Sequence, residues 1–185
     1  MEFIENEILD KIDISKKGNE GEIKVFSELD RILDKDGPYT VHRNFVIPNR
    51  NFDIDAVIVG PKGLIVLEIK NYQHQLVFID NRLFISTDSK ILSPISPDRD
   101  PRKELQRHLN VFIQYLAEGG FTEIRMYSAL VFSEEYTVSI EKGTKVGTYI
   151  ICGAKELEIY VNGLPIDLMF TPDLCLRINS FLQGK

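Results

Sequence analysis

The chain has 185 residues, of which 43% are hydrophobic and 27% are charged, and its formal net charge is -6. This length and composition fit one globular domain with a sizeable core, and no apolar run approaches the roughly 18 residues of a membrane span. The acidic balance disfavours a passive nucleic-acid-binding protein, because such proteins gain most of their affinity by neutralising phosphates with a basic surface. The acidic N-terminal segment lacks the layout of a signal peptide, and the two cysteines lack zinc-site spacing, so we expect a cytoplasmic protein with reduced thiols.

The predicted elements are helices with a 3.6-residue apolar period and short strands bounded by turn residues. The first half of the chain predicts an amphipathic lead-in at 1–14, a helix at 17–34, and strands at 39–47, 52–59, 64–71, 76–79 and 82–86. The second half predicts a loop at 87–100, a helix at 101–118, strands at 123–132 and 146–152, and helices at 154–161 and 172–182. No internal repeat interrupts this order.

Three carboxylates and a lysine lie close together in the second and third predicted strands. If the loop at 60–63 is a tight turn, antiparallel pairing puts Asp55 opposite Glu68 and Asp53 opposite Lys70. Because strand side chains alternate, all four would share one face of the sheet. Asp55 and Glu68 would then be a like-charge pair that is unfavourable without a compensating cation.

The apolar runs beside these charges indicate where the charges lie. Ala56–Val59 and Leu64–Leu67 are apolar on both faces, which is typical of a sheet covered on both sides. The carboxylates begin where this covered region ends, so we expect them at the mouth of a cleft. The alternative is a sheet with one solvated face, where polar alternation is ordinary.

The predicted first helix carries a glutamate on its apolar stripe. Glu22 follows the same spacing as Phe26, Leu29 and Leu33, which points it toward the sheet. An acidic residue in the first turn of a helix is also favourable for the helix dipole alone. Position leaves both interpretations open for Glu22.

A cluster of polar and basic residues lies on the helix predicted at 101–118. Arg102, Lys103 and Arg107 occupy faces other than its apolar stripe and could meet phosphates, although such charges are more often a solvated face. The chain has three histidines, at positions 42, 74 and 108, which are scattered along the sequence. His42, His74 and His108 therefore suggest no other enzyme class.

Three ordered motifs resemble the nuclease-related domain (NERD) family, which is placed in the PD-(D/E)xK nuclease superfamily. They are Gly18–Glu22, Phe52–Asp55 and Gly63–Asn71. The resemblance implies an α/β fold with a mixed central sheet flanked by helices, as in restriction endonucleases. It covers a core at 16–133, preceded by a lead-in at 1–15 and followed by an α/β extension at 134–185 that packs on the same domain.

The resemblance also implies a metal-dependent phosphodiesterase that acts on nucleic acid, with DNA favoured. Asp55 and Glu68 match the acidic metal ligands, with the main-chain carbonyl of Ile69 as a further ligand for Mg²⁺ or Mn²⁺. Lys70 matches the superfamily lysine, and Glu22 matches the helix glutamate near the site. Arg102, Lys103 and Arg107 would contact the nucleic acid.

Two other hypotheses stay open at this stage. The segment Asp100–Glu104 departs from the Asn-Pro-x-x-Gln pattern of many relatives, and Ala56 replaces a frequent histidine. Together with the acidic charge, this favours an inactive module that binds nucleic acid or a protein partner. The acidic cluster could also be a set of structural ion pairs, in which Lys70 would satisfy Asp53 across the strands.

Overall fold

The structure is a computed structural model that describes residues 20–34, 37–50, 52–71, 75–79, 82–86, 92–95, 100–133, 145–146 and 149–184. Within these residues, six strands form one mixed sheet in the order β1-β2-β3-β7-β9-β8. The strands are β1 (Thr40–Val46), β2 (Asp53–Gly60), β3 (Gly63–Lys70), β7 (Met126–Phe132), β8 (Lys145–Val146) and β9 (Tyr149–Gly153). Neighbouring strands from β1 to β3 are antiparallel, whereas β3, β7 and β9 run parallel. The predicted mixed central sheet is confirmed.

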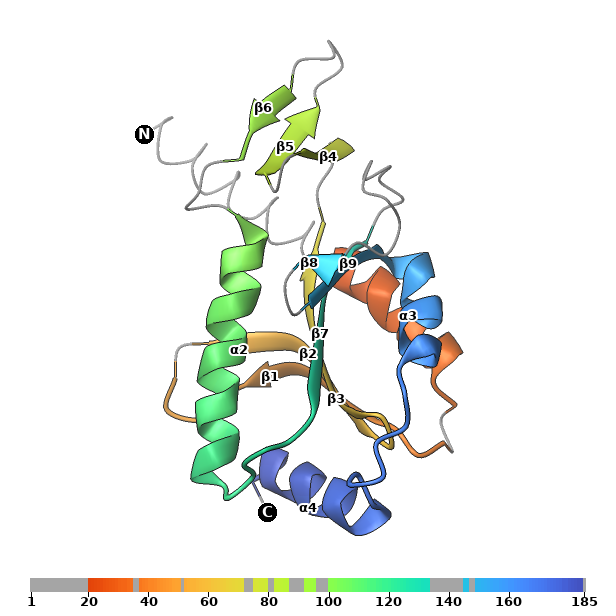
Figure 1. The fold of residues 1–185 in the computed structure, drawn as a ribbon, viewed down its shortest axis with the longest axis vertical. Helices are drawn as coiled ribbons and strands as arrows, with labels where there is room; N and C mark the ends of the chain where they lie inside the picture. Colours follow the sequence, from red (N-terminus) through yellow and green to blue (C-terminus); the bar gives the residue numbers. More distant parts are fainter. Residues whose placement is uncertain are drawn as a thin grey trace, which may run out of the picture.

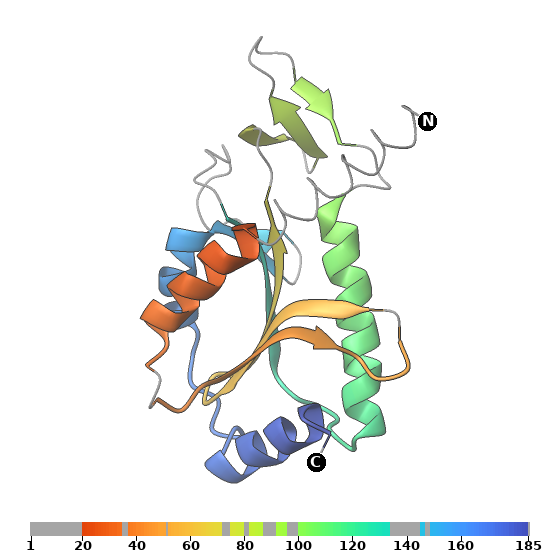
Figure 2. The same ribbon diagram turned by 180° about the vertical axis from the view of Figure 1, so that it is seen from behind.

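Helices cover both faces of this sheet (Figures 1 and 2). They are a helix at residues 20–32, α2 (Pro101–Glu118), α3 (Leu157–Gly163), which follows a 3-10 turn at Ala154–Glu156, and α4 (Pro172–Leu182). Side chains of α2 and α4 pack on one face, where Val57, Leu64 and Val66 are fully buried. Side chains of helix 20–32 and α3 pack on the other face, over Ile58 and Leu67.

The long helix α2 starts and packs as its sequence predicts. Asp100 caps it by accepting the main-chain N–H of Arg102 at 3.0 Å, and Pro101 occupies the first turn. The predicted apolar stripe is buried against the sheet. This packing fixes the rotation of α2, and with it the direction of every other side chain on the helix.

The alternation of side chains breaks in β1 and β2 at one level. Ile54 and Val57 of β2 both face α2, although strict alternation would put them on opposite faces. In β1, Phe45 faces α2 whereas Val41 packs on the other side, and Asn44 between them has a positive φ of 47°. Both strands therefore twist sharply beside Asp55, which is the first residue of the candidate site.

A second sheet of three antiparallel strands lies at the end of the molecule opposite α4 (Figure 1). Its strands are β4 (Gln75–Ile79), β5 (Arg82–Ser86) and β6 (Leu92–Pro94). The β4–β5 pairing confirms the predicted hairpin. Strand β6 lies within the segment that the sequence predicts as a loop, 87–100. It pairs only along one side of β5 and carries no apolar alternation of its own, so its sequence has no strand pattern.

The C-terminal part differs from the predicted elements in its details. The strand predicted at 146–152 is two strands, since β8 pairs antiparallel with β9 through Val146 and Tyr149. The helix predicted at 154–161 begins as the 3-10 turn and continues as α3, while the last helix is α4 as predicted. The lead-in predicted at 1–15 lies outside the described residues.

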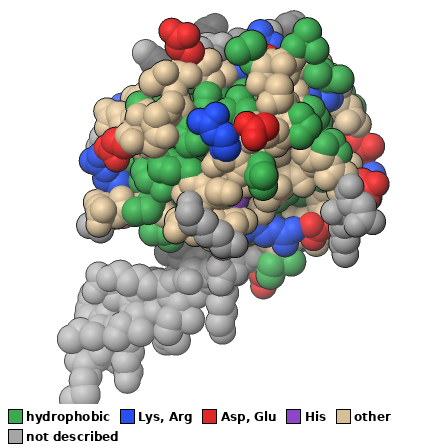
Figure 3. Space-filling view, turned by 90° about the horizontal axis from the view of Figure 1, so that it is seen from below, with side chains coloured by type: hydrophobic (Ala, Val, Ile, Leu, Met, Phe, Trp, Pro, Cys, Tyr) green, Lys and Arg blue, Asp and Glu red, His purple; other side chains and the backbone are tan. Residues whose placement is uncertain are grey.

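No helix among the described residues is both long enough and apolar enough to cross a bilayer. Figure 3 views the end of the molecule that α4 forms, and it shows hydrophobic side chains interspersed with charged ones. Leu168, Met169 and Leu176 are exposed in and before α4.

Candidate active site

The site forms where β2 and β3 part. The predicted register of these strands is confirmed along their paired length, which ends at Ala56 and Leu67. Beyond this point β2 stays with β1 and β3 stays with β7, so a fork opens in the sheet. The predicted continuation of the pairing to Asp55 and Asp53 is wrong, because β2 and β3 pair no further than Ala56 and Leu67.

The side chain of Asp55 spans this fork. Its Oδ2 accepts the main-chain N–H of Ile69 at 2.6 Å and replaces the missing strand partner. In a strand, the N–H and C=O of one residue point to the same side, so the carbonyl of Ile69 also faces the fork. The next residue points the other way, since the carbonyl of Lys70 accepts the N–H of Ser133 beside β7 at 3.1 Å.

Glu68 is buried on the face that α2 covers, with an exposed fraction of 2%. Its Oε1 lies 2.8 Å from Nζ of Lys70, and its Oε2 lies 2.8 Å from Nδ1 of His108 on α2. This hydrogen bond raises the pKa of His108, against the opposite effect of burial, and so favours the imidazolium. Both oxygens of Glu68 are therefore engaged, one by the Lys70 ammonium and the other by the His108 ring.

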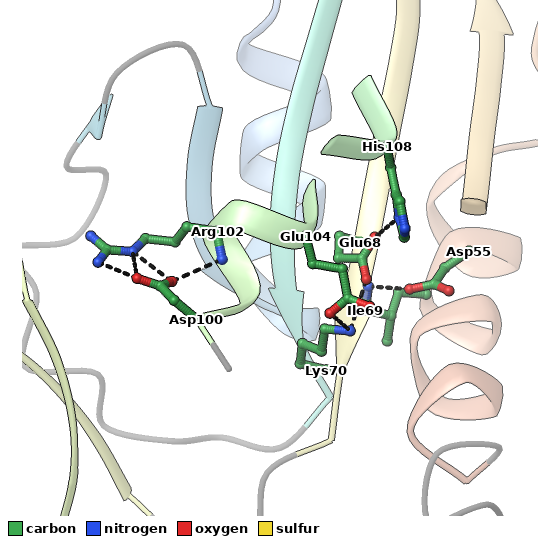
Figure 4. A network of polar contacts seen from close by, with 8 residues as sticks. All are labelled: Asp55, Glu68, Ile69, Lys70, Asp100, Arg102, Glu104 and His108. Atoms are coloured by element: carbon green, nitrogen blue, oxygen red, sulfur yellow. Dashed lines mark hydrogen bonds and ion pairs between the residues drawn. The ribbon is translucent and has the colours of Figure 1, made fainter. Parts of the chain in front are cut away.

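Lys70 bridges two carboxylates from different elements (Figure 4). Besides Glu68, its Nζ contacts Oε2 of Glu104 on α2 at 2.7 Å. The predicted ion pair between Lys70 and Asp53 is therefore wrong: Asp53 is exposed on the part of β2 that has left β3. Glu68 and Lys70 share one face, as the alternation predicts.

The two buried carboxylates have opposite electrostatic surroundings. Burial, and after it the charge of Glu68, raises the pKa of Asp55 to about 7. Burial would also raise the pKa of Glu68, but the hydrogen bond from His108 and the charge of Lys70 hold it below its usual value. Burial would lower the pKa of Lys70, yet the two carboxylates that it contacts raise it, so the ammonium form persists. Asp55 therefore bears the uncompensated repulsion of the pair.

The structure places Glu22 near this cluster, as the apolar stripe of its helix predicts. Burial raises the pKa of Glu22, and the negative charges of Asp53 and Glu68 raise it further. A hydrogen bond with Asn44 lowers it and so opposes these effects. Asn44 is the residue with positive φ opposite the break in β2, a conformation that Asn adopts more readily than most residues. The turn of β1 thus holds the Glu22 side chain beside the fork.

Gly21 allows the helix to approach the site so closely. A Cβ at this position would lie 2.6 Å from Cβ of Asn71 and 3.0 Å from Oγ of Ser133. These two residues follow β3 and β7 and are joined by a hydrogen bond of 2.8 Å from Ser133 Oγ to Asn71 Oδ1. A side chain at position 21 would push Glu22 away from the fork.

The three predicted nucleic-acid-binding residues have different surroundings. Arg102 is held at the start of α2, with its Nε 2.9 Å from Oδ1 of Asp100, and Figure 4 places this pair away from Asp55. Lys103 is exposed. Arg107 is exposed and lies over the ring of Phe52.

Sequence reasoning missed His108 and Glu104 as members of the site. His108 is three residues from Leu105 on the buried stripe of α2, and a buried histidine there requires a polar partner. Glu104 is four residues before His108, so both reach the same strand. This spacing was a usable signal, but the identity of their partners depends on how α2 docks on β3.

The oxygen donors of the fork fit a hard divalent cation. Asp55, Glu68 and the carbonyl of Ile69 supply oxygen only, and a cation would relieve the repulsion that raises the pKa of Asp55. Among the described residues, no three acidic, histidine or cysteine side chains are already grouped as a metal site. Lys70 and His108 each engage one oxygen of Glu68, so a cation would share these oxygens with them through the remaining lone pairs or displace one of them.

The fold and the cluster together define a nuclease-like α/β core. Residues 17–133 match the family model described as nuclease-related domain, or NERD. No curated protein and no solved structure matches the chain. Because the match spans more than half of the 185 residues, the chain belongs to the NERD family, and its function is nuclease-related.

Proposed function

We propose that the protein is a divalent-metal-dependent nuclease that hydrolyses phosphodiester bonds in nucleic acid, with DNA as the favoured substrate. The observation that carries this proposal is the pair of half-buried Asp55 and buried Glu68 at the fork, with Lys70 in contact with Glu68 at 2.8 Å. A carboxylate pair with one pKa raised to about 7 is costly for folding, and such costs concentrate at functional sites.

Asp55, Glu68 and the carbonyl of Ile69 would hold Mg²⁺ or Mn²⁺, and Glu22 would contribute directly or through water. When bound, the cation would lower the pKa of a water molecule and stabilise charge on the phosphate. Asp55 can turn toward a cation only by weakening its bond to the N–H of Ile69 or by using its other oxygen. Glu68 would bind the cation through a remaining lone pair of its oxygens or in place of Lys70 or His108.

Lys70 would act as a fixed positive charge. Its raised pKa keeps the ammonium protonated near neutral pH, which excludes it as a general base in this state. The 22% exposed fraction of its side chain leaves room for a substrate oxygen or a water molecule at Nζ. Lys70 therefore orients the attacking water or stabilises the charge that develops on the phosphate.

The phosphate backbone would run along the start of α2. Lys103 and Arg107 are exposed there, and Arg102 would contribute positive charge by exchanging Asp100 for a phosphate. A local basic strip is sufficient for an enzyme, because catalysis does not require the strong equilibrium binding of a basic DNA-binding protein.

The test is cleavage of labelled DNA and RNA strands by the pure protein with Mg²⁺, with Mn²⁺ and with EDTA. We expect metal-dependent cleavage that Lys70→Ala lowers by about a hundredfold. Lys62→Ala is the control, because Lys62 lies in the turn between β2 and β3, at the end of these strands opposite the fork. Equal activity of wild type and Lys70→Ala would show that the activity comes from elsewhere.

A second candidate function is an inactive module that uses the same surface for binding. The engagement of both oxygens of Glu68 and the absence of a grouped three-residue metal site among the described residues favour it. A salt series of DNA binding, with and without Mg²⁺, distinguishes the two. Salt-dependent binding without any cleavage supports the module, whereas no binding at low salt excludes a nucleic-acid module.

A further inference from the structure

We propose that Arg107 and Phe52 form a stacking platform for one unpaired base, which makes single-stranded nucleic acid the substrate class of this site. This inference rests on the proposed function, since it assigns the substrate that the fork receives. Cζ of Arg107 lies 4.9 Å from the centroid of the Phe52 ring, within the range of a cation–π contact. Arg107 is exposed and Phe52 is half-buried, so the ring supports the guanidinium from below.

The stack lies beside the proposed metal ligands. The ring of Phe52 is 5.6 Å from the ring of His108, and Nδ1 of His108 is 2.8 Å from Oε2 of Glu68. Phe52 immediately precedes β2, and Arg107 is the neighbour of His108 on α2. One side chain therefore separates the platform from the carboxylate that would face the scissile phosphate.

The chemistry of the platform selects an unpaired base. A guanidinium over an aromatic ring leaves its other side open to solvent, and nucleobases stack on guanidinium planes and on aromatic rings. In a duplex both faces of each base are covered by neighbouring bases, so only an unpaired base can use this surface. Within the described part of the chain, none of the ion pairs involves Arg107.

Lys103 provides a phosphate contact on the same side of α2. It is exposed and precedes Arg107 by four residues, so the two side chains are neighbours on the helix surface. The pair combines a flat stacking surface with a point charge. This combination is typical of sites that track a single strand without reading its sequence.

The experiment measures 2-aminopurine fluorescence and strand affinity with the full chain in EDTA, so that no cleavage is needed for the readout. The probes are single DNA and RNA strands carrying 2-aminopurine and a duplex of the same DNA sequence. We expect binding to quench the single strands, and the affinity for single strands to exceed that for the duplex. Arg107→Lys should abolish the quenching of 2-aminopurine fluorescence and weaken single-strand binding by about tenfold. Lysine keeps the positive charge but lacks a planar group on which a base can stack.

The chain offers a matched control elsewhere in the fold. Cζ of Arg43 lies 5.0 Å from the centroid of the Phe26 ring, but Arg43 is paired with Asp30 on the opposite face of the sheet. Arg43→Lys should leave the quench unchanged. Phe52→Leu should reduce the quench, because the guanidinium loses the ring that holds it flat.

Two results would overturn the inference: bound single strands whose fluorescence is unchanged, or Arg107→Lys with the quench and affinity of the wild type. The readout is independent of catalysis. A protein that quenches but does not cut with Mg²⁺ retains the platform and loses the nuclease proposal. A protein that cuts without quenching retains the nuclease proposal and loses the platform.

Discussion

Replacing Asp55 with Asn should stabilise the metal-free protein at pH 8. The substitution removes the ionised carboxylate that burial and Glu68 destabilise, while the side-chain oxygen of Asn can still accept the N–H of Ile69. The pKa of Asp55 is raised from 3.8 to about 7. Since one pKa unit corresponds to about 1.4 kcal/mol, the ionised form costs about 4 kcal/mol, and we expect a gain of about 2 to 4 kcal/mol.

The pH dependence of this gain has a definite sign. The native state holds the proton of Asp55 more tightly than the unfolded state, so wild-type stability falls as pH rises from the unfolded pKa through about 7. The advantage of Asp55→Asn should therefore be fully developed at pH 8 and less than half as large at pH 5.

Urea denaturation in EDTA at both pH values measures the difference in unfolding free energy. Asp53→Asn is the control, because Asp53 is exposed, and we expect it to change stability by less than about 0.5 kcal/mol. An Asp55→Asn protein that is less stable than wild type at pH 8 would refute the electrostatic interpretation of the fork. So would a gain that is the same at both pH values.

Two further substitutions test the contacts around the fork. His108→Ala should destabilise the protein by about 3 kcal/mol at pH 6, because buried Glu68 loses one of its two cationic partners. The pKa of His108 is raised in the folded protein, so this loss of stability should shrink as pH rises through that pKa. Urea denaturation at pH 6 and pH 9 measures the change. A loss of stability that is independent of pH would indicate a packing role only. Gly21→Ala should cost about 1 to 3 kcal/mol, because the added Cβ would lie 2.6 Å from Cβ of Asn71. Gly163→Ala is its control, since an added Cβ there has no atom within 4 Å, and equal thermal stability of the two variants would contradict the close approach of the helix.

The sequence predicts the covered parts of the fold well, because local patterns determine them. Burial periodicity and the Asp100 cap specify α2, and the short turn at 60–63 specifies the register from Val59 to Ala56. The fork could not be predicted in this way. Register arithmetic assumes that two paired strands stay together, but β2 and β3 pair only as far as Ala56 and Leu67, although each keeps its other neighbour beyond that point.

The same reasoning explains which site residues were found. Lys70 and Glu68 were placed on one face by alternation, which holds along β3. Asp53 was assigned to Lys70 because the twist at Asn44 has no strong signature in the sequence. The partners of His108 depend on the docking of α2 on the sheet, which is a long-range contact that periodicity does not encode.

Isothermal titration of Mn²⁺ into metal-free protein at pH 8 tests most directly whether the fork is a divalent-cation site. Wild type should bind the ion, and Asp55→Asn should not, although it should be folded and more stable. Binding to Asp55→Asn with wild-type affinity, or no binding to wild type, would contradict the assignment of Asp55 and Glu68 as ligands.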